Sequence, residues 1–193
     1  MSELGLDIHD FAESFMKALE GKDEYTSGHS KRVSETAECI ARCLGLDEDR
    51  CYFINVAGHF HDIGKINIPD AILLKTGKMR PQEMEVMKLH AVYGFEILQG
   101  CKGLEHLARV ILHHHERFDG KGYPSSLRGT DIPLESRIIA IADAFDAMTT
   151  FRSYRHPVSI EEALKSIEKE IGGQFDPEAA RCFLSIHNTH REP

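Results

Sequence analysis

The chain has 193 residues, a formal net charge of −8, 41% hydrophobic residues and 28% charged residues, which is typical of one globular domain with a sizeable core. The negative charge argues against binding of polymeric nucleic acid, which requires a basic surface. The sequence shows no signal-peptide pattern, no disulfide framework among its five cysteines, and no apolar run near the ~20 residues of a membrane span. We therefore expect a cytoplasmic protein without membrane insertion.

Apolar stripes with helical periodicity run through the chain and predict an all-α, single-domain bundle. No alternating run is long enough to build a sheet. Ser159 followed by Glu162 is a capping-box pattern, and Asp176 stands before a proline at a first-turn position. The expected helices cover 6–20, 33–44, 47 toward 61, a short segment around 69–73, 81–98, 103–115, 133–149, 159–170 and 176–187.

The chain divides into a main domain and two short ends. We expect an N-terminal helix over 1–20, a main domain over 21–187 and a flexible tail over 188–193. The N-terminal helix is also compatible with a remnant of a linker helix to a sensory domain. The longest break between helices, 116–132, is rich in Gly, Ser, Pro and charge, and loops of that length are often functional.

Histidine and aspartate side chains recur on the inward faces and at the ends of these helices. Asp143, for example, stands among apolar residues, and a buried carboxylate there needs a partner. Neutral imidazoles and carboxylates are the ligands that divalent transition metals take, and a metal ion explains the whole set. The candidate positions are His29, His61, Asp62, His90, His114, His115 and Asp143.

Two motifs carry a family resemblance. The pair His61-Asp62, followed by Ile-Gly-Lys, resembles the HD superfamily of metal-dependent phosphohydrolases. The run His114-His115-Glu116, followed by Asp-Gly-Lys-Gly-Tyr-Pro over 119–124, resembles the HD-GYP subfamily of bacterial cyclic di-GMP phosphodiesterases. The resemblance extends from the Thr-Ser-Gly-His-Ser segment near 26–30 to the Gln-Phe-Asp-Pro segment at 174–177, which is most of the chain.

The resemblance implies an HD-type helical bundle with the glycine-rich loop near the active site, and it assigns metal-ligand roles to the seven candidate positions. That set is too large for one tetrahedral ion and suits two ions that share a carboxylate, for which we expect Asp62. Two ions can polarise a phosphodiester and lower the pKa of a bridging water, giving a hydroxide that attacks phosphorus. Fe or Mn is favoured, and Co, Ni and Zn also suit such ligands. In some members a glutamate four residues before the first histidine helps to hold a third ion; Tyr25 stands there, so we expect two ions.

Four residues are predicted to contact substrate. Lys65 follows the His-Asp pair closely enough to reach a phosphate as a point charge, and we count it with Asp62 as catalytic. By the resemblance, Arg152 and Arg155 contact the substrate's phosphates, which suits the planar arginine fork. Tyr123 either stacks on a guanine base or packs the loop.

Three further residues near the motif have open roles. Glu116 and Asp119 are expected either to orient metal-bound imidazoles or to cap the loop and pair with an arginine. His113 lies outside the family pattern, and we expect a supporting or surface position for it. None of the three is expected to be catalytic.

The leading functional hypothesis is hydrolysis of cyclic di-GMP to linear pGpG, with a slow second cut to GMP. One alternative is an HD-type phosphohydrolase that acts on another nucleotide or cyclic dinucleotide. The other is a catalytically weak binding or signalling module. Sensory or signalling proteins are the protein partners that the resemblance suggests, and the oligomeric state is left open.

Overall fold

The computed structural model describes residues 8–21, 28–151 and 156–188. Within these ranges the regular elements are all helices, and the only strand-like pairing is an isolated bridge between Ile171 and Phe175, so the predicted all-α class is confirmed. The elements are α1 (Ile8–Glu20), α2 (His29–Cys43), α3 (Glu48–Phe60), η2 (Ile63–Asn67), α4 (Asp70–Leu73), α5 (Pro81–Lys88), α6 (His90–Gln99), α7 (Glu105–Leu112), η3 (Gly129–Asp131), α8 (Leu134–Thr149), α9 (Ile160–Lys169) and α10 (Pro177–Asn188).

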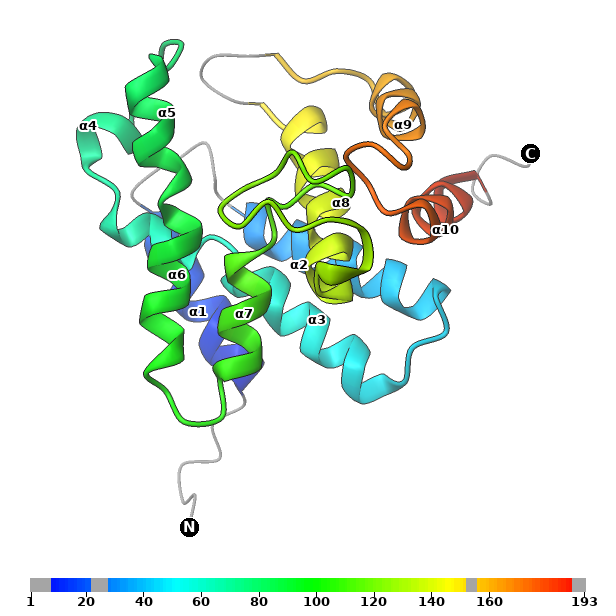
Figure 1. Cartoon of the computed structure of the whole chain (residues 1–193), viewed down its shortest axis with the longest axis horizontal. Helices are drawn as coiled ribbons and strands as arrows, with labels where there is room; N and C mark the ends of the chain where they lie inside the picture. Colours follow the sequence, from blue (N-terminus) through cyan, green and yellow to red (C-terminus); the bar gives the residue numbers. More distant parts are fainter. Residues whose placement is uncertain (1–7, 22–27, 152–155, 189–193) are drawn as a thin grey trace.

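The helices pack around one hydrophobic core. Helix α2 packs against α3, α8 and α10, while α6 packs against α7 and η2 (Figure 1). Helix α1 contacts α3 and η2, and its Ala12 and Met16 are buried in the core. The segment between α7 and α8 crosses in front of α8 in Figure 1. This arrangement brings α2, the end of α3, α6, the end of α7 and α8 together around one centre.

Side-chain caps mark the start of three helices, two of them predicted from the sequence. The side chain of Asp47 accepts from the backbone N–H of Arg50 at the start of α3. Ser159 and Glu162 form the predicted reciprocal box at α9. Asp176 accepts backbone N–H groups in the first turn of α10. Local hydrogen bonding therefore decides where these helices begin.

Two predicted helices end or break earlier than expected. The helix expected over 81–98 is divided at Leu89 into α5 and α6. The Leu89 N–H donates to the carbonyl of Val86, three residues earlier, and the His90 ring donates to the carbonyl of Met87, so the regular i to i−4 hydrogen bonding is interrupted. The helix expected over 103–115 stops at Leu112. In both cases the interruption falls beside histidines of the candidate metal set.

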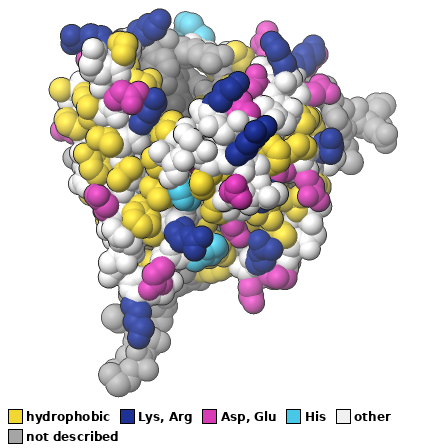
Figure 2. All heavy atoms as spheres, in the orientation of Figure 1, with side chains coloured by type: hydrophobic (Ala, Val, Ile, Leu, Met, Phe, Trp, Pro, Cys, Tyr) yellow, Lys and Arg dark blue, Asp and Glu magenta, His cyan; other side chains and the backbone are white. Residues whose placement is uncertain are grey.

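The surface is mixed in charge. On the face shown in Figure 2, the described acidic and basic side chains are interspersed, without a continuous basic patch. Hydrophobic side chains gather over α4, α5 and α6, at the left of the view. Leu74, Met84 and Leu89 are among the exposed large hydrophobic residues. In the part of the chain that the structure describes, no helix has the length and apolar character needed to cross a membrane.

Candidate metal centre

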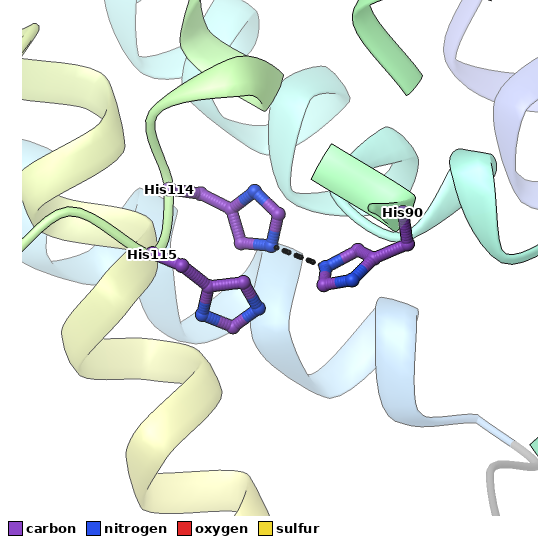
Figure 3. A group of neighbouring side chains, drawn as sticks. All are labelled: His90, His114 and His115. Atoms are coloured by element: carbon purple, nitrogen blue, oxygen red, sulfur yellow. Dashed lines mark hydrogen bonds between the residues drawn. The ribbon is translucent and has the colours of Figure 1, made fainter. Parts of the chain in front are cut away.

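The predicted ligand positions converge in two groups of three. His29, His61 and Asp143 form one group, and His90, His114 and His115 form the other (Figure 3). Within each group the potential ligand atoms lie within 4.8 Å of one another. His29, His61, His90 and His114 are almost fully buried, at 4% exposure or less. Residues from five segments of the chain therefore aim ligand atoms at one buried region.

Asp62 lies between the two groups, with one carboxylate oxygen toward each. Its Oδ2 is 3.6 Å from Nε2 of His29 and 3.3 Å from Nε2 of His61. Its Oδ1 is 3.4 Å from Nε2 of His90. A carboxylate in this position could contact two ions at once.

Adjacent residues converge because the chain leaves its helix at these points. Successive side chains of an α-helix point about 100° apart, since 3.6 residues make a turn. His61 is the C-cap of α3 and Asp62 precedes η2. His114 and His115 follow the end of α7 in a tight turn, with ring centroids 4.0 Å apart. Ending each helix at the motif thus lets neighbouring side chains face the same centre.

Three imidazoles are oriented by backbone carbonyls. Nδ1 of His61, His90 and His114 each contacts the carbonyl oxygen three residues earlier, at 2.7, 2.7 and 2.6 Å. A carbonyl only accepts, so each Nδ1 carries a proton, and in the neutral form of each ring Nε2 is the nitrogen with a lone pair for the centre. The same carbonyl contact therefore fixes the metal-binding tautomer of all three rings.

The second group places two such lone pairs against each other. Nε2 of His90 and Nε2 of His114 are 3.3 Å apart, the contact dashed in Figure 3. Burial lowers the pKa of His90, and it lowers that of His114 to about 3 with the help of neighbouring histidines. Neutral, buried nitrogens that converge in this way fit a bound cation, so the donor set is suited to a divalent metal.

His29 is held differently. Its Nδ1 lies 2.6 Å from Oδ2 of Asp146, and its Nε2 lies 3.2 Å from Nε2 of His61. Both partners are acceptors, so the His29 ring carries two protons when no ion is bound. Burial opposes this charge, but hydrogen bonds to Asp146 and Asp62, together with the charge of Asp143, raise the pKa of His29 to about 9.

Asp146 is a residue that the sequence analysis missed. It is 6% exposed and pairs with Arg32 as well as with His29. Its position three residues after Asp143 puts both aspartates on the same face of α8. The spacing of three residues between the two aspartates was the sequence signal that could have identified Asp146.

Lys65 lies beside the shared carboxylate. Its Nζ is 2.5 Å from Oδ2 of Asp62. Burial disfavours an ionised Asp62, but the positive charge of Lys65, together with the hydrogen bond from His29, outweighs it and holds the pKa of Asp62 well below its ordinary value. Lys65 is therefore within reach of a phosphate bound at the centre.

Glu116 anchors the end of the glycine-rich loop by hydrogen bonds. Its carboxylate accepts the backbone N–H groups of Ser125 at 2.7 Å and Leu127 at 3.1 Å. Gly122 packs so closely against the turn after His115 that a Cβ there would lie 2.4 Å from Cα of Glu116. Of the roles left open for Glu116, the structure thus favours the loop cap.

The other motif residues also pack within the loop. Asp119 pairs with Arg117 at 2.9 Å, the arginine-pairing role anticipated for it. The Tyr123 ring packs against His115 at a centroid distance of 4.9 Å, and Nζ of Lys88 lies 5.4 Å from the Tyr123 ring centre. Nδ1 of His113 is 3.7 Å from Oε1 of Glu116, beyond hydrogen-bond distance, so His113 lies beside the loop base.

Three residues named in the sequence analysis lie outside the described part of the chain. They are Arg152 and Arg155, predicted to bind phosphate, and Tyr25, at the position of the third-ion glutamate. Their roles stay predictions.

The structure is that of a helical protein with a largely buried cluster of histidines and aspartates that suits a divalent metal. The sequence model of the HD domain family matches residues 13–179. The chain belongs to the HD domain family. This confirms the family resemblance inferred from the His-Asp and Gly-Tyr-Pro motifs.

Similar proteins carry related names. The chain is 42% identical over 170 residues to the cyclic di-GMP phosphodiesterase response regulator RpfG of Xanthomonas campestris, covering 87% of this chain and 45% of that protein. It is 40% identical over 190 residues to a cyclic di-GMP phosphodiesterase of Thermotoga maritima, covering 95% and 52%. Among solved structures, a cyclic GMP-AMP specific phosphodiesterase of Vibrio cholerae matches with a TM-score of 0.60 and 31% identity, covering 97% and 43%. The chain thus spans about half the length of the curated relatives it matches.

Proposed function

We propose that this chain is the catalytic domain of a cyclic di-GMP phosphodiesterase that opens the ring to linear pGpG. The observation that carries the proposal is the position of Asp62, which directs one oxygen toward each of two groups of buried ligand atoms. The names of the similar proteins support the substrate class.

His29, His61 and Asp143 would hold one ion, the three histidines at 90, 114 and 115 would hold a second, and Asp62 would contribute a ligand to both. Fe or Mn is the favoured metal. Bound divalent ions would polarise the scissile phosphodiester and lower the pKa of a water molecule. Two ions, rather than three, follow from Tyr25.

The protein's own residues bind and orient the substrate. Lys65 would neutralise part of the charge of the phosphate at the centre. Arg152 and Arg155 would hold the second phosphate, where their planar guanidinium groups can make bidentate contacts. For Tyr123 we propose a guanine contact at the edge of the ring, since its face packs against His115.

The decisive experiment is anaerobic turnover of cyclic di-GMP with Fe(II) or Mn(II), followed by chromatography over time. We expect pGpG first and GMP slowly, if at all. The variant His61→Ala with Asp62→Ala should lose both turnover and metal. His59→Ala is the matched control, because His59 is also buried on α3 but bonds to Ser34 at 3.1 Å, outside the centre. Parent-like turnover by the double variant would mean that the site is misplaced.

A second substrate deserves the same assay. The similar Vibrio cholerae structure is of a cyclic GMP-AMP specific enzyme, so 3′3′-cyclic GMP-AMP should be tested beside cyclic di-GMP. Preference for the mixed dinucleotide would replace the proposed substrate but keep the reaction. Tight binding of either ligand without turnover would favour the signalling module instead.

A further inference from the structure

The imidazole of His29 has a hydrogen-bond partner of a different kind from those of three other rings in the centre. His61, His90 and His114 rest on backbone carbonyls of their own segments. His29 opens α2, and its Nδ1 is held at 2.6 Å by a carboxylate from α8, that of Asp146. For His29, a side chain from a distant helix therefore supplies the hydrogen-bond acceptor that the local backbone supplies for the other three rings.

Asp146 is itself held in place. Nε of Arg32 lies 2.5 Å from its Oδ1, and an Nη2 hydrogen bond of 3.2 Å reaches its Oδ2. Arg32 and His29 are three residues apart on α2, so they share a helix face. The two-pronged arginine contact keeps the carboxylate ionised and fixes its plane. Asp146 can then only accept a hydrogen bond from His29.

We propose that Asp146 is a positioning residue for the metal centre. By accepting the Nδ1 proton of His29, it orients the ring so that Nε2 is the ligand atom, and a carboxylate acceptor makes that nitrogen a stronger donor than a carbonyl would. Nε2 of His29 does point to the centre, 3.5 Å from Oδ1 of Asp143. The inference rests on the proposed function, because it assigns this support to one of the two proposed ions.

The competing explanation is an ion pair that only joins α2 to α8. The chain offers a matched control on the same helix. Glu135, also 6% exposed, pairs with Arg50 at 2.9 Å and joins α8 to α3. It belongs to neither group of potential metal ligands. Asp146→Asn and Glu135→Gln thus each neutralise one buried, arginine-paired carboxylate of α8.

The test is Mn(II) titration of the full chain by calorimetry, with thermal unfolding of the metal-free proteins in parallel. For the parent we expect two ions. Asp146→Asn should lower the affinity for one ion by about 10- to 100-fold and leave the affinity for the other unchanged. Asp146→Ala, which also removes the acceptor atom, should weaken it further. Glu135→Gln should lower the melting temperature yet keep both affinities.

Two results would overturn the positioning role. One is parent affinity for both ions in the Asp146 variants; the other is loss of the same ion in Glu135→Gln. If Asp146→Ala does not fold, Asp146→Asn, which has nearly the same shape, still decides. If the parent chain hydrolyses cyclic di-GMP but the Asp146 variants bind both ions normally, only this inference is wrong. If the parent chain binds no Mn(II), the proposed function is wrong as well.

Discussion

Gly64 is the position where a single methyl group should disturb the metal centre most directly. It follows Asp62 by two residues in η2, and it touches the start of α6. A Cβ at Gly64 would lie 1.9 Å from the carbonyl oxygen of His90 and 2.4 Å from the backbone nitrogen of Gly94. Both contacts are with backbone atoms, so no side chain can turn away to relieve them.

The size of the effect follows from these distances. Real Cβ contacts are essentially never shorter than 3.0 Å, so Gly64→Ala must separate η2 from α6 by at least 3.0 − 1.9 = 1.1 Å. Overpacking of this kind typically costs about 1–3 kcal/mol. For a chain of this size that is a fall in melting temperature of about 2–12 °C. The shift also moves His90 away from Asp62, and a misplacement of about 1 Å can cost about 100-fold in rate.

The assay combines thermal unfolding with turnover of cyclic di-GMP. Gly100→Ala is the control, because Gly100 ends α6 with φ −75° and a Cβ there meets nothing within 4 Å. We expect Gly100→Ala to keep parent turnover and to gain up to about 1 kcal/mol of stability. Parent melting temperature and turnover in Gly64→Ala would refute the idea that this close approach aligns the two halves of the centre.

Three further predictions concern the phosphate contacts, the loop and the pH. Arg155→Ala should weaken cyclic di-GMP binding about ten- to a hundredfold, the loss of one charge-assisted contact, with metal content unchanged; calorimetry that finds parent affinity would contradict it. Glu116→Gln should lower the free energy of unfolding by about 1–3 kcal/mol, because the single amide oxygen cannot replace both carboxylate oxygens as acceptors for the loop N–H groups. Hydrogen exchange at Ser125 and Leu127 should then become faster, and unchanged exchange would count against the proposed loop cap. Without metal, the pKa of His29 is raised to about 9, so an ion that binds Nε2 of His29 must displace a proton. The affinity for this ion should therefore rise by up to about tenfold per pH unit between about pH 6 and 8. The other ion, whose histidines have lowered pKa values, should bind with little pH dependence, and Mn(II) titrations in which neither affinity changes would contradict this assignment.

The sequence alone determined the helical class, the metal-binding chemistry and the family. Apolar periodicity placed the helices because burial of one face requires it. Caps such as Ser159 and Asp176 are local hydrogen bonds, so they were readable without tertiary information. The candidate donors were predicted because a carboxylate within an apolar helix, such as Asp143, and a run of histidines after an apolar helix suggest a common partner.

Only the tertiary structure decided how those donors divide between two groups and what holds them. The motif could not show that Asp62 gives one oxygen to each group, because this depends on η2 lying against α6 at Gly64. It could not show the break at Leu89 either, since the ring of His90 competes there for a helix carbonyl. The contact of His29 with Asp146 joins residues 117 positions apart in the sequence. Such contacts depend on how α2 and α8 pack together, and no local pattern encodes that.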